Sequence, residues 1–411
     1  MKEIDALVTG AETRQGLAVI RGLGWKGVSV CAAGAEADSM GFYSRYATAR
    51  CHYPSAMEDK RGFVDAILAA VREHRIRVVL PAVESTVIAL DEFREEVESV
   101  CRVALAPRPA LHAALDKKET LALAARVGIP IPRSFYPADM KEAEDFAKSV
   151  GYPVVMKPRA MASFGKGGGP KFKVAYAHDR AELARQLDTL CPGGLYPILQ
   201  EYCPGVRTCM GVFFVEGEML GIYQYKGIRE LPLTGGVTTL HVSVPIDPDL
   251  RKWTQSLVTA MGYSGVANSE FRVDEATGRK VLMEINPRFY GPQSGSNLLG
   301  LNFPYAAYRY TLEGHKEPMP VEYPIGVRNR YLRGDVSALW QLWQREAVDY
   351  LAPLPGRGRA LLDVLSGFSP SVQSDVMDWG DPWPGVREGL ALIRQYGREM
   401  AGYYLRKMWS A

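Results

Sequence analysis

The first hundred residues alternate short apolar runs with segments of helical periodicity. The stretch 4–34 predicts strand, glycine-containing turn, helix and strand, and 76–84 predicts another buried strand after a helix around 63–71. Strands that alternate with helices indicate a parallel, doubly wound sheet. The turn 10–16 lacks GxGxxG spacing, so we favour a plain strand-to-helix turn over a dinucleotide site.

A new pattern begins after the prolines at 107 and 109, where we expect a domain boundary. A helix begins near Asp116 and ends at Gly128, and the chain then turns to antiparallel pairs. These pairs are strand–loop–strand at 152–176, a hinge followed by a hairpin around 215–218, and a second pair across 262–291. This part of the chain is therefore expected to be α+β.

Beyond about residue 318 the pattern is mainly helical. The segments 338–348 and 389–409 are amphipathic. The basic residues of the last segment could touch a membrane surface, but we favour a packed C-terminal cap with a solvated basic face.

Composition narrows the class without identifying a partner. The 411 residues suffice for two to four domains, and a net charge of +3 gives no argument for nucleic acid or membrane binding. The six cysteines form no CxxC pair, which favours a reducing, cytoplasmic compartment. We find no signal-peptide pattern and no apolar run long enough for a transmembrane segment.

Charged and polar residues interrupt the apolar segment 281–291. Glu284, Asn286 and Arg288 share one face, because side chains on a strand alternate with period two. Glu270, on the preceding strand, can reach the same face. Two carboxylates and an amide oxygen suit Mg²⁺, which keeps water and phosphate oxygens as further ligands. The alternative is a structural ion-pair cluster with Arg272 or Arg288.

Lysines and glycines precede this constellation. Lys157 lies within a strongly apolar strand and needs an anionic partner, for which a triphosphate would serve. Lys117 is a second candidate cation, although a solvated lysine at a helix start is the alternative. The glycine loop 163–172 could hold phosphate through its backbone N–H groups and lysines, or be an ordinary hairpin turn. Its predicted phosphate contacts are Ser163, Gly165, Lys166 and Gly167.

A hinge at 199–205 ends another apolar strand. Its backbone could meet an adenine edge, and Glu201 could accept from the exocyclic amine. The predicted contacts are Gln200, Glu201, Tyr202 and Cys203. The alternative is a strand end with a solvated glutamate.

The order of these features resembles the ATP-grasp superfamily from about residue 110 to 310. "DKKET" and "VVMKPR" match its two nucleotide-binding lysines, "LQEY" its hinge, and "SEF" and "MEINPR" its metal strands, with E-x-N-P-R the most specific. The chain is similar to carbamoyl-phosphate-synthetase-like and peptide-ligase-like members, and its tail more weakly to members associated with surface polysaccharide synthesis. One departure is that many relatives carry an acid just past the hinge, where this chain has Val206, Arg207 and Thr208.

The resemblance implies a fold with four parts. These are a pre-ATP-grasp Rossmann-like domain with a doubly wound parallel sheet (1–110), an α+β small subdomain (111–195), an α+β large subdomain with the metal strands (196–317) and a helical C-terminal extension (318–411). It implies ATP and Mg²⁺ as cofactors, with the metal on Glu270, Glu284 and Asn286.

The resemblance also implies carboxylate activation by ATP. An acyl phosphate would form and an amine would displace phosphate, giving an amide. Lys117 and Lys157 would hold the phosphates, with Lys157 and Arg288 as the catalytic residues. Two alternatives stay open: bicarbonate activation as in carbamoyl phosphate synthesis, and a non-catalytic nucleotide-binding regulator in a surface-polysaccharide or cell-wall pathway.

The substrates are less defined by the sequence. We expect a small-molecule carboxylate and amine, no nucleic acid, and leave a homodimer open. The loop 225–241 lies where a substrate loop belongs, although a basic surface loop is the alternative. The substrate contacts that we expect are Lys226, Arg229, Gly235, Gly236, Ser294 and Glu84, the last at the end of a strand.

Overall fold

The fold is taken from a computed structural model that describes residues 3–157, 174–190, 196–231, 236–344 and 356–409. The predicted contacts Ser163, Gly165, Lys166, Gly167 and Gly235 lie outside the described residues. Among the described residues, no helix combines the length and apolarity needed to cross a bilayer.

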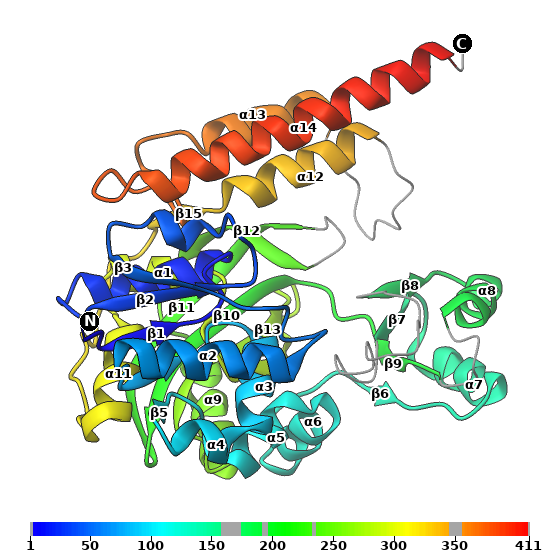
Figure 1. Cartoon of the computed structure of the whole chain (residues 1–411). Coiled ribbons are helices and arrows are strands. Elements are labelled where there is room, and N and C mark those ends of the chain that lie inside the picture. The colour runs from blue at the N-terminus through cyan, green and yellow to red at the C-terminus, as the bar shows by residue number, and fades with distance from the viewer. Residues whose placement is uncertain (1–2, 158–173, 191–195, 232–235, 345–355, 410–411) are drawn as a thin grey trace.

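The N-terminal sheet is parallel and has the order β3-β2-β1-β4-β5 (Figure 1). Its strands are β1 (Ala6–Val8), β2 (Val30–Gly34), β3 (Ala47–His52), β4 (Val78–Leu80) and β5 (Arg102–Val103). Val8 packs with α1 (Arg14–Gly24), whereas the adjacent Leu7 packs with α2 (Lys60–His74). Helices therefore cover both faces, which confirms the predicted doubly wound sheet.

Glu84 begins a helix, which corrects the prediction that it ends a strand. The strand β4 ends at Leu80, and α3 (Glu84–Glu92) follows, then α4 (Arg94–Glu98). A Pro-Ala-Val turn separates the two elements, because the apolar run 76–84 continues past the last strand residue.

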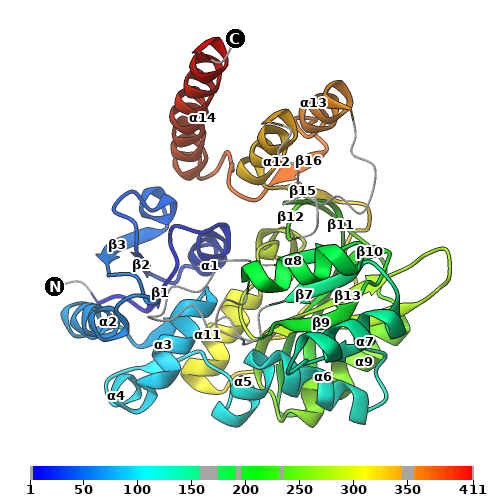
Figure 2. The ribbon, with the colours of Figure 1, turned by 90° about the vertical axis from the view of Figure 1, so that its right-hand side faces the viewer.

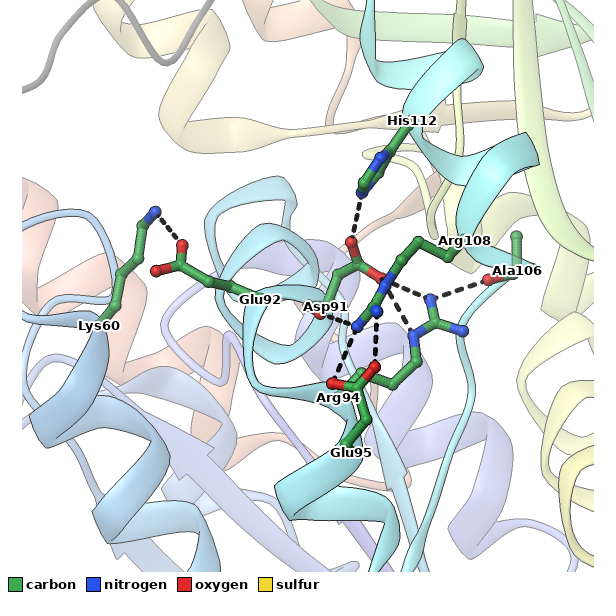
Figure 3. Close-up of polar contacts among 8 residues, drawn as sticks. All are labelled: Lys60, Asp91, Glu92, Arg94, Glu95, Ala106, Arg108 and His112. Atoms are coloured by element: carbon green, nitrogen blue, oxygen red, sulfur yellow. Dashed lines mark hydrogen bonds and ion pairs between the residues drawn. The ribbon is translucent and has the colours of Figure 1, made fainter.

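Asp91 joins the N-terminal sheet's helices to the segment that follows it. Its carboxylate lies 2.7 Å from Arg94, 3.4 Å from Arg108 and 2.6 Å from His112 (Figure 3). The last two residues belong to α5 (Arg108–Leu115), which leads into α6 (Lys117–Arg126). The Asp116 side chain caps α6, and this network fixes where α6 presents Lys117.

A smaller antiparallel sheet has the order β6-β9-β7-β8. Its strands are β6 (Ser134–Phe135), β7 (Val154–Lys157), β8 (Ala175–Ala177) and β9 (Ile198–Glu201). The helices α7 (Met140–Val150) and α8 (Arg180–Leu190) pack on it and share its apolar cluster. The predicted boundary at 195/196 would assign β9 to the large subdomain, but β9 pairs with β6 and β7.

The largest sheet has the order β14-β13-β10-β11-β12-β15-β16. Its strands are β10 (Val206–Val215), β11 (Glu218–Leu231), β12 (Val237–Ser243), β13 (Gly265–Val273), β14 (Lys280–Asn286), β15 (Arg328–Arg330) and β16 (Val372–Ser374). Glu216 and Gly217 have φ of 49° and 88°, so the predicted hairpin is present and has the positive angles of a type I′ turn.

The two faces of this sheet differ in character. One face packs against α9 (Pro248–Ala260) through an apolar cluster that includes Leu282 and Ile285. A bulge at Met283 shifts the register between Glu270–Glu284 and Phe271–Leu282. The extra residue lets Leu282 enter the apolar face while Glu284 points to the opposite, polar one. Two helices, α10 (Gln293–Leu298) and α11 (Phe303–Glu313), follow β14.

In the part of the C-terminal extension that the structure describes, the helices are α12 (Leu332–Gln344), α13 (Arg357–Ser366) and α14 (Trp383–Trp409), and all of them lie on the same side of the molecule (Figures 1 and 2). It also supplies β15 and β16, so the predicted boundary at 317/318 separates two strands from the sheet in which they pair. Buried ion pairs tie it to α1, with Arg14–Asp375 at 2.6 Å and Arg21–Asp381 at 2.9 Å.

Candidate functional site

Two carboxylates face each other across neighbouring strands of the large sheet. Glu270 on β13 is the register partner of Glu284 on β14, and both are partly buried. Asn286 Nδ2 donates to Glu270 at 3.1 Å and to Glu284 at 3.4 Å. A half-turn of this amide would present its oxygen at the same point, because the two ends are nearly isosteric. The set fits a hard divalent ion that completes its shell with water and phosphate oxygens.

The protein itself does not complete a metal cage here. Among the described residues, no group of three or more His, Cys, Asp or Glu side chains is placed to hold a metal ion. Mg²⁺ is usually held by one or two carboxylates together with substrate phosphates, so an incomplete cage agrees with a metal that arrives with a nucleotide.

Each acid is paired with one cation from a different element. Lys117 Nζ at the start of α6 lies 2.9 Å from Glu284, and Arg207 Nη1 on β10 lies 2.7 Å from Glu270. Burial raises the pKa of Glu284, but Lys117 and then Lys157 outweigh burial and lower it below its usual value. Burial also raises the pKa of Glu270; Arg207 opposes this rise and Glu284 adds to it, so it stays raised. The two acids are therefore not equivalent.

Lys157, at the end of β7, approaches the same place from the small sheet. Its Nζ donates to Gln200 Oε1 at 2.7 Å, and no carboxylate lies within ion-pair distance among the described residues. Burial, and then repulsion by Lys117, lower the pKa of Lys157 to about 8. Two lysines close enough to repel each other, one without an acid, form a place where an anion would be stabilised.

Arg288 lies just beyond the end of β14. Its Nη2 donates to Asn286 Oδ1 at 3.1 Å, and its Nε lies 3.7 Å from Glu84 Oε2. The second distance is too long for a hydrogen bond, and Nε is buried without a hydrogen-bond partner in the described part of the chain. The Arg288 guanidinium therefore lies between Glu84 and Asn286, next to the residues that could hold a metal ion.

The hinge glutamate, Glu201, is buried. The alternative of a strand end with a solvated glutamate is therefore wrong. Its carboxylate accepts from the Arg133 backbone N–H at 2.9 Å, from Arg133 Nε at 3.2 Å and from Arg279 Nη2 at 2.5 Å. An adenine amine would have to share these oxygens. Tyr202 is partly exposed and Cys203 is buried.

The structure separates the predicted substrate residues. Lys226 pairs with Glu275, and Arg229 lies 2.6 Å from Asp335 of α12. Ser294 donates to Asp375 at 2.9 Å, so it lies against the C-terminal extension. Of the two loop glycines, Gly236 is described and comes directly before β12. Among the predicted substrate residues that the structure describes, Glu84 is the one paired with Arg288.

Sequence reasoning missed the residues that join these parts. Arg207 was noted only as a departure from the acid of many relatives, and it proves to bridge Glu270 and Glu230, the latter at 2.9 Å. Its place directly after the hinge, where many relatives carry an acid, was the available signal. Asp375 carried no signal, because its partner Arg14 is 361 residues away.

Two protein families match separate parts of the chain. Residues 116–189 match a family described as "Carbamoyl-phosphate synthase L chain, ATP binding domain", and residues 216–333 match "ATP-grasp in the biosynthetic pathway with Ter operon". These two matches confirm the resemblance to the ATP-grasp superfamily that the sequence motifs predicted.

Individual relatives show how far the likeness extends. The carbamoyl phosphate synthase large chain of Thermus thermophilus is 28% identical over 180 residues, 40% of this chain and 16% of the relative. The chain thus spans about a sixth of that relative's length.

Two solved structures share the fold. A biotin carboxylase–β-γ-ATP complex from Campylobacter jejuni gives a TM-score of 0.63 at 18% identity, covering 79% of this chain and 74% of the other. An L-amino acid ligase from Bacillus licheniformis gives 0.56 at 16% identity, covering 77% and 78%.

Proposed function

We propose that this chain is an ATP- and Mg²⁺-dependent ligase that joins a carboxylate to an amine through an acyl phosphate. The observation that carries the proposal is the opposed pair Glu270 and Glu284, with Asn286 and Arg288 on the same face and two lysines approaching it. The likeness to an amino acid ligase fold supports the reaction class.

Different residues would bind the metal ion and the phosphates. Glu270, Glu284 and Asn286 would hold Mg²⁺, which when bound neutralises phosphate charge and orients the transferred group. Lys117 and Lys157 would contact the phosphates. In this structure Lys117 pairs with Glu284, so nucleotide binding would exchange that partner for a phosphate oxygen.

Arg288 would act at the reacting centre. Its guanidinium would stabilise the charge that develops on the transferred phosphoryl group or on the acyl oxygen. Glu84, whose carboxylate lies 3.7 Å from Arg288 Nε, would itself meet the amine substrate.

Bicarbonate activation is a second candidate. It is supported by the curated relative, a carbamoyl phosphate synthase, and by the biotin carboxylase fold. Both reactions would use the same phosphate and metal residues, and they differ in the size of the acid that is activated.

The deciding experiment is phosphate release from Mg-ATP across amino acids, dipeptides, amino sugars and bicarbonate. Lys157→Ala should abolish release, whereas Lys148→Ala, an exposed lysine on α7 of the same subdomain, should leave it unchanged. Release that needs an acid–amine pair supports the ligase, and release with bicarbonate alone supports the second candidate. ATP binding without release under any condition would refute both.

A further inference from the structure

A cavity of about 620 Å³ lies between the large sheet and the C-terminal helices α12 and α13. Residues of the strands β10, β11, β12, β13 and β15 form one wall of the cavity. Residues of α12 and α13 form the other wall. Its volume falls in the range of small-molecule sites, about 300–1,000 Å³.

Arginine dominates the polar lining of this cavity. Five arginines and three carboxylates line it. The arginines are Arg207, Arg229, Arg272, Arg328 and Arg359, and the carboxylates are Glu230, Asp335 and Asp363. The cavity therefore carries an excess of positive charge.

Part of this charge has no strong partner within the protein. Arg229 is held by Asp335 at 2.6 Å and by the Asp363 carbonyl at 2.9 Å. Arg272 lies 3.4 Å from Glu230 and donates to the Gly205 carbonyl at 3.1 Å, whereas the exposed Arg328 side chain has no ion-pair or hydrogen-bond partner among the described residues. Guanidinium groups in this state favour planar anions, with which they form paired hydrogen bonds.

Arg207 connects the cavity to the paired acids. Its Nε donates to Glu230 in the cavity at 2.9 Å, and its Nη1 donates to Glu270 at 2.7 Å. A molecule in the cavity would thus lie one side chain away from the site where we place the metal and the transferred phosphoryl group.

The helical wall is partly apolar. Ala338, Leu339 and Leu342 of α12 and Val364 of α13 line it, beside the charged Asp335, Arg359 and Asp363. A ligand that matches both walls has a short carbon skeleton as well as negative charge.

We propose that this cavity holds the distal end of the acid substrate, which is a carboxylic acid bearing at least one further anionic group, a second carboxylate or a phosphate. This inference rests on the proposed function. The reacting carboxylate would lie at Arg288 and the paired acids, and the distal anion would lie on Arg272 and Arg328.

A purely structural role explains these features less well. Ion pairs that only dock α12 on the sheet would need matched charges and a filled interface. Arg229–Asp335 has that form. The open volume and the Arg328 side chain, which lines it without a partner among the described residues, do not have that form.

The test is isothermal titration of the full chain, without nucleotide, with three probes. Glutarate and O-phospho-L-serine carry the two kinds of distal anion, and glutaramide is the neutral match of glutarate. Arg328→Gln removes the exposed, unpaired charge. Arg251→Gln is the control, because Arg251 is an exposed arginine on α9, which packs on the other face of the same sheet.

We expect one of the two acids to bind saturably, about tenfold more weakly in Arg328→Gln and unchanged in Arg251→Gln, because one charge-assisted contact is lost. Glutaramide should not bind. Which acid binds more tightly tells a carboxylate from a phosphate. Failure of both acids to bind at millimolar concentration, equal binding in both variants, or competition by a non-hydrolysable ATP analogue would overturn the proposal.

The two proposals fail separately. Anion binding that depends on Arg328, with no phosphate release from Mg-ATP under any condition, would refute the ligase and leave an anion site. Phosphate release that needs an acid and amine, with the same preference among acids in Arg328→Gln, would keep the ligase and refute the cavity assignment.

Discussion

The paired acids of the large sheet and the acid of the hinge are held in different ways. Glu201 accepts three donors from Arg133 and Arg279, which fill its carboxylate. Glu270 and Glu284 each have one cationic partner and share the Asn286 amide. A carboxylate that accepts from three donors is fixed in place, whereas a carboxylate with a single cationic partner can exchange that partner for a metal ion. The number of partners therefore separates a structural carboxylate from one available for chemistry.

The largest expected effect on activity is that of Glu284→Gln. This substitution removes a negative charge at the place where a metal ion should replace the lysine partner. Phosphate release should fall by about a hundredfold or more, because a neutral amide cannot compensate the metal charge. Glu275→Gln, an exposed acid that pairs with Lys226, is the matched control and should be unaffected. Full turnover in Glu284→Gln would remove the distinction between the two kinds of acid.

Glu201→Gln should act mainly on stability. Losing the charge that Arg133 and Arg279 share should lower the free energy of unfolding by about 2 kcal/mol, measured by urea denaturation. The KM for ATP should change little. An unchanged stability with a strongly raised KM would instead make Glu201 a nucleotide contact.

The pH dependence of nucleotide binding should report Lys157. Burial and Lys117 lower its pKa to about 8, so Lys157 is charged below that pH and neutral above it. The affinity for an ATP analogue should therefore decline as the pH rises through about 8, by up to about tenfold per pH unit. In Lys157→Arg, which stays charged, titration calorimetry should show no such decline. The same decline in that variant would assign it to another group.

The smallest effect is expected at Asp91, a third acid of the fixed kind. His112→Ala removes one of the partners of Asp91. Because the His112 side chain is well exposed, the substitution should lower the free energy of unfolding by only about 0.5 kcal/mol. Turnover should not change, and His178→Ala, an exposed histidine of the small subdomain, should change neither quantity. A loss of turnover in His112→Ala alone would mean that the Asp91 network tunes Lys117 and does more than hold α5.

The sequence predicted the features that depend on residues close together along the chain. The alternation in 281–288 placed Glu284, Asn286 and Arg288 on one face, and the hairpin at Glu216–Gly217 follows from backbone preference. The sequence could not predict that Arg279, 78 residues from Glu201, would saturate it. Partners so distant along the chain are brought together only by the folded sheet. The bulge at Met283 was invisible for the same reason, because it is a property of the pairing with β13.

The two short strands of the C-terminal extension protect an edge. β15 pairs with β12, and β16 pairs with β15 as the outermost strand on this side of the sheet. A chain ending before residue 318 would leave β12 with a row of unpaired N–H and C=O groups, a template for strand addition by another copy. Removing this extension should therefore increase aggregation of the protein, independently of any role of the C-terminal helices.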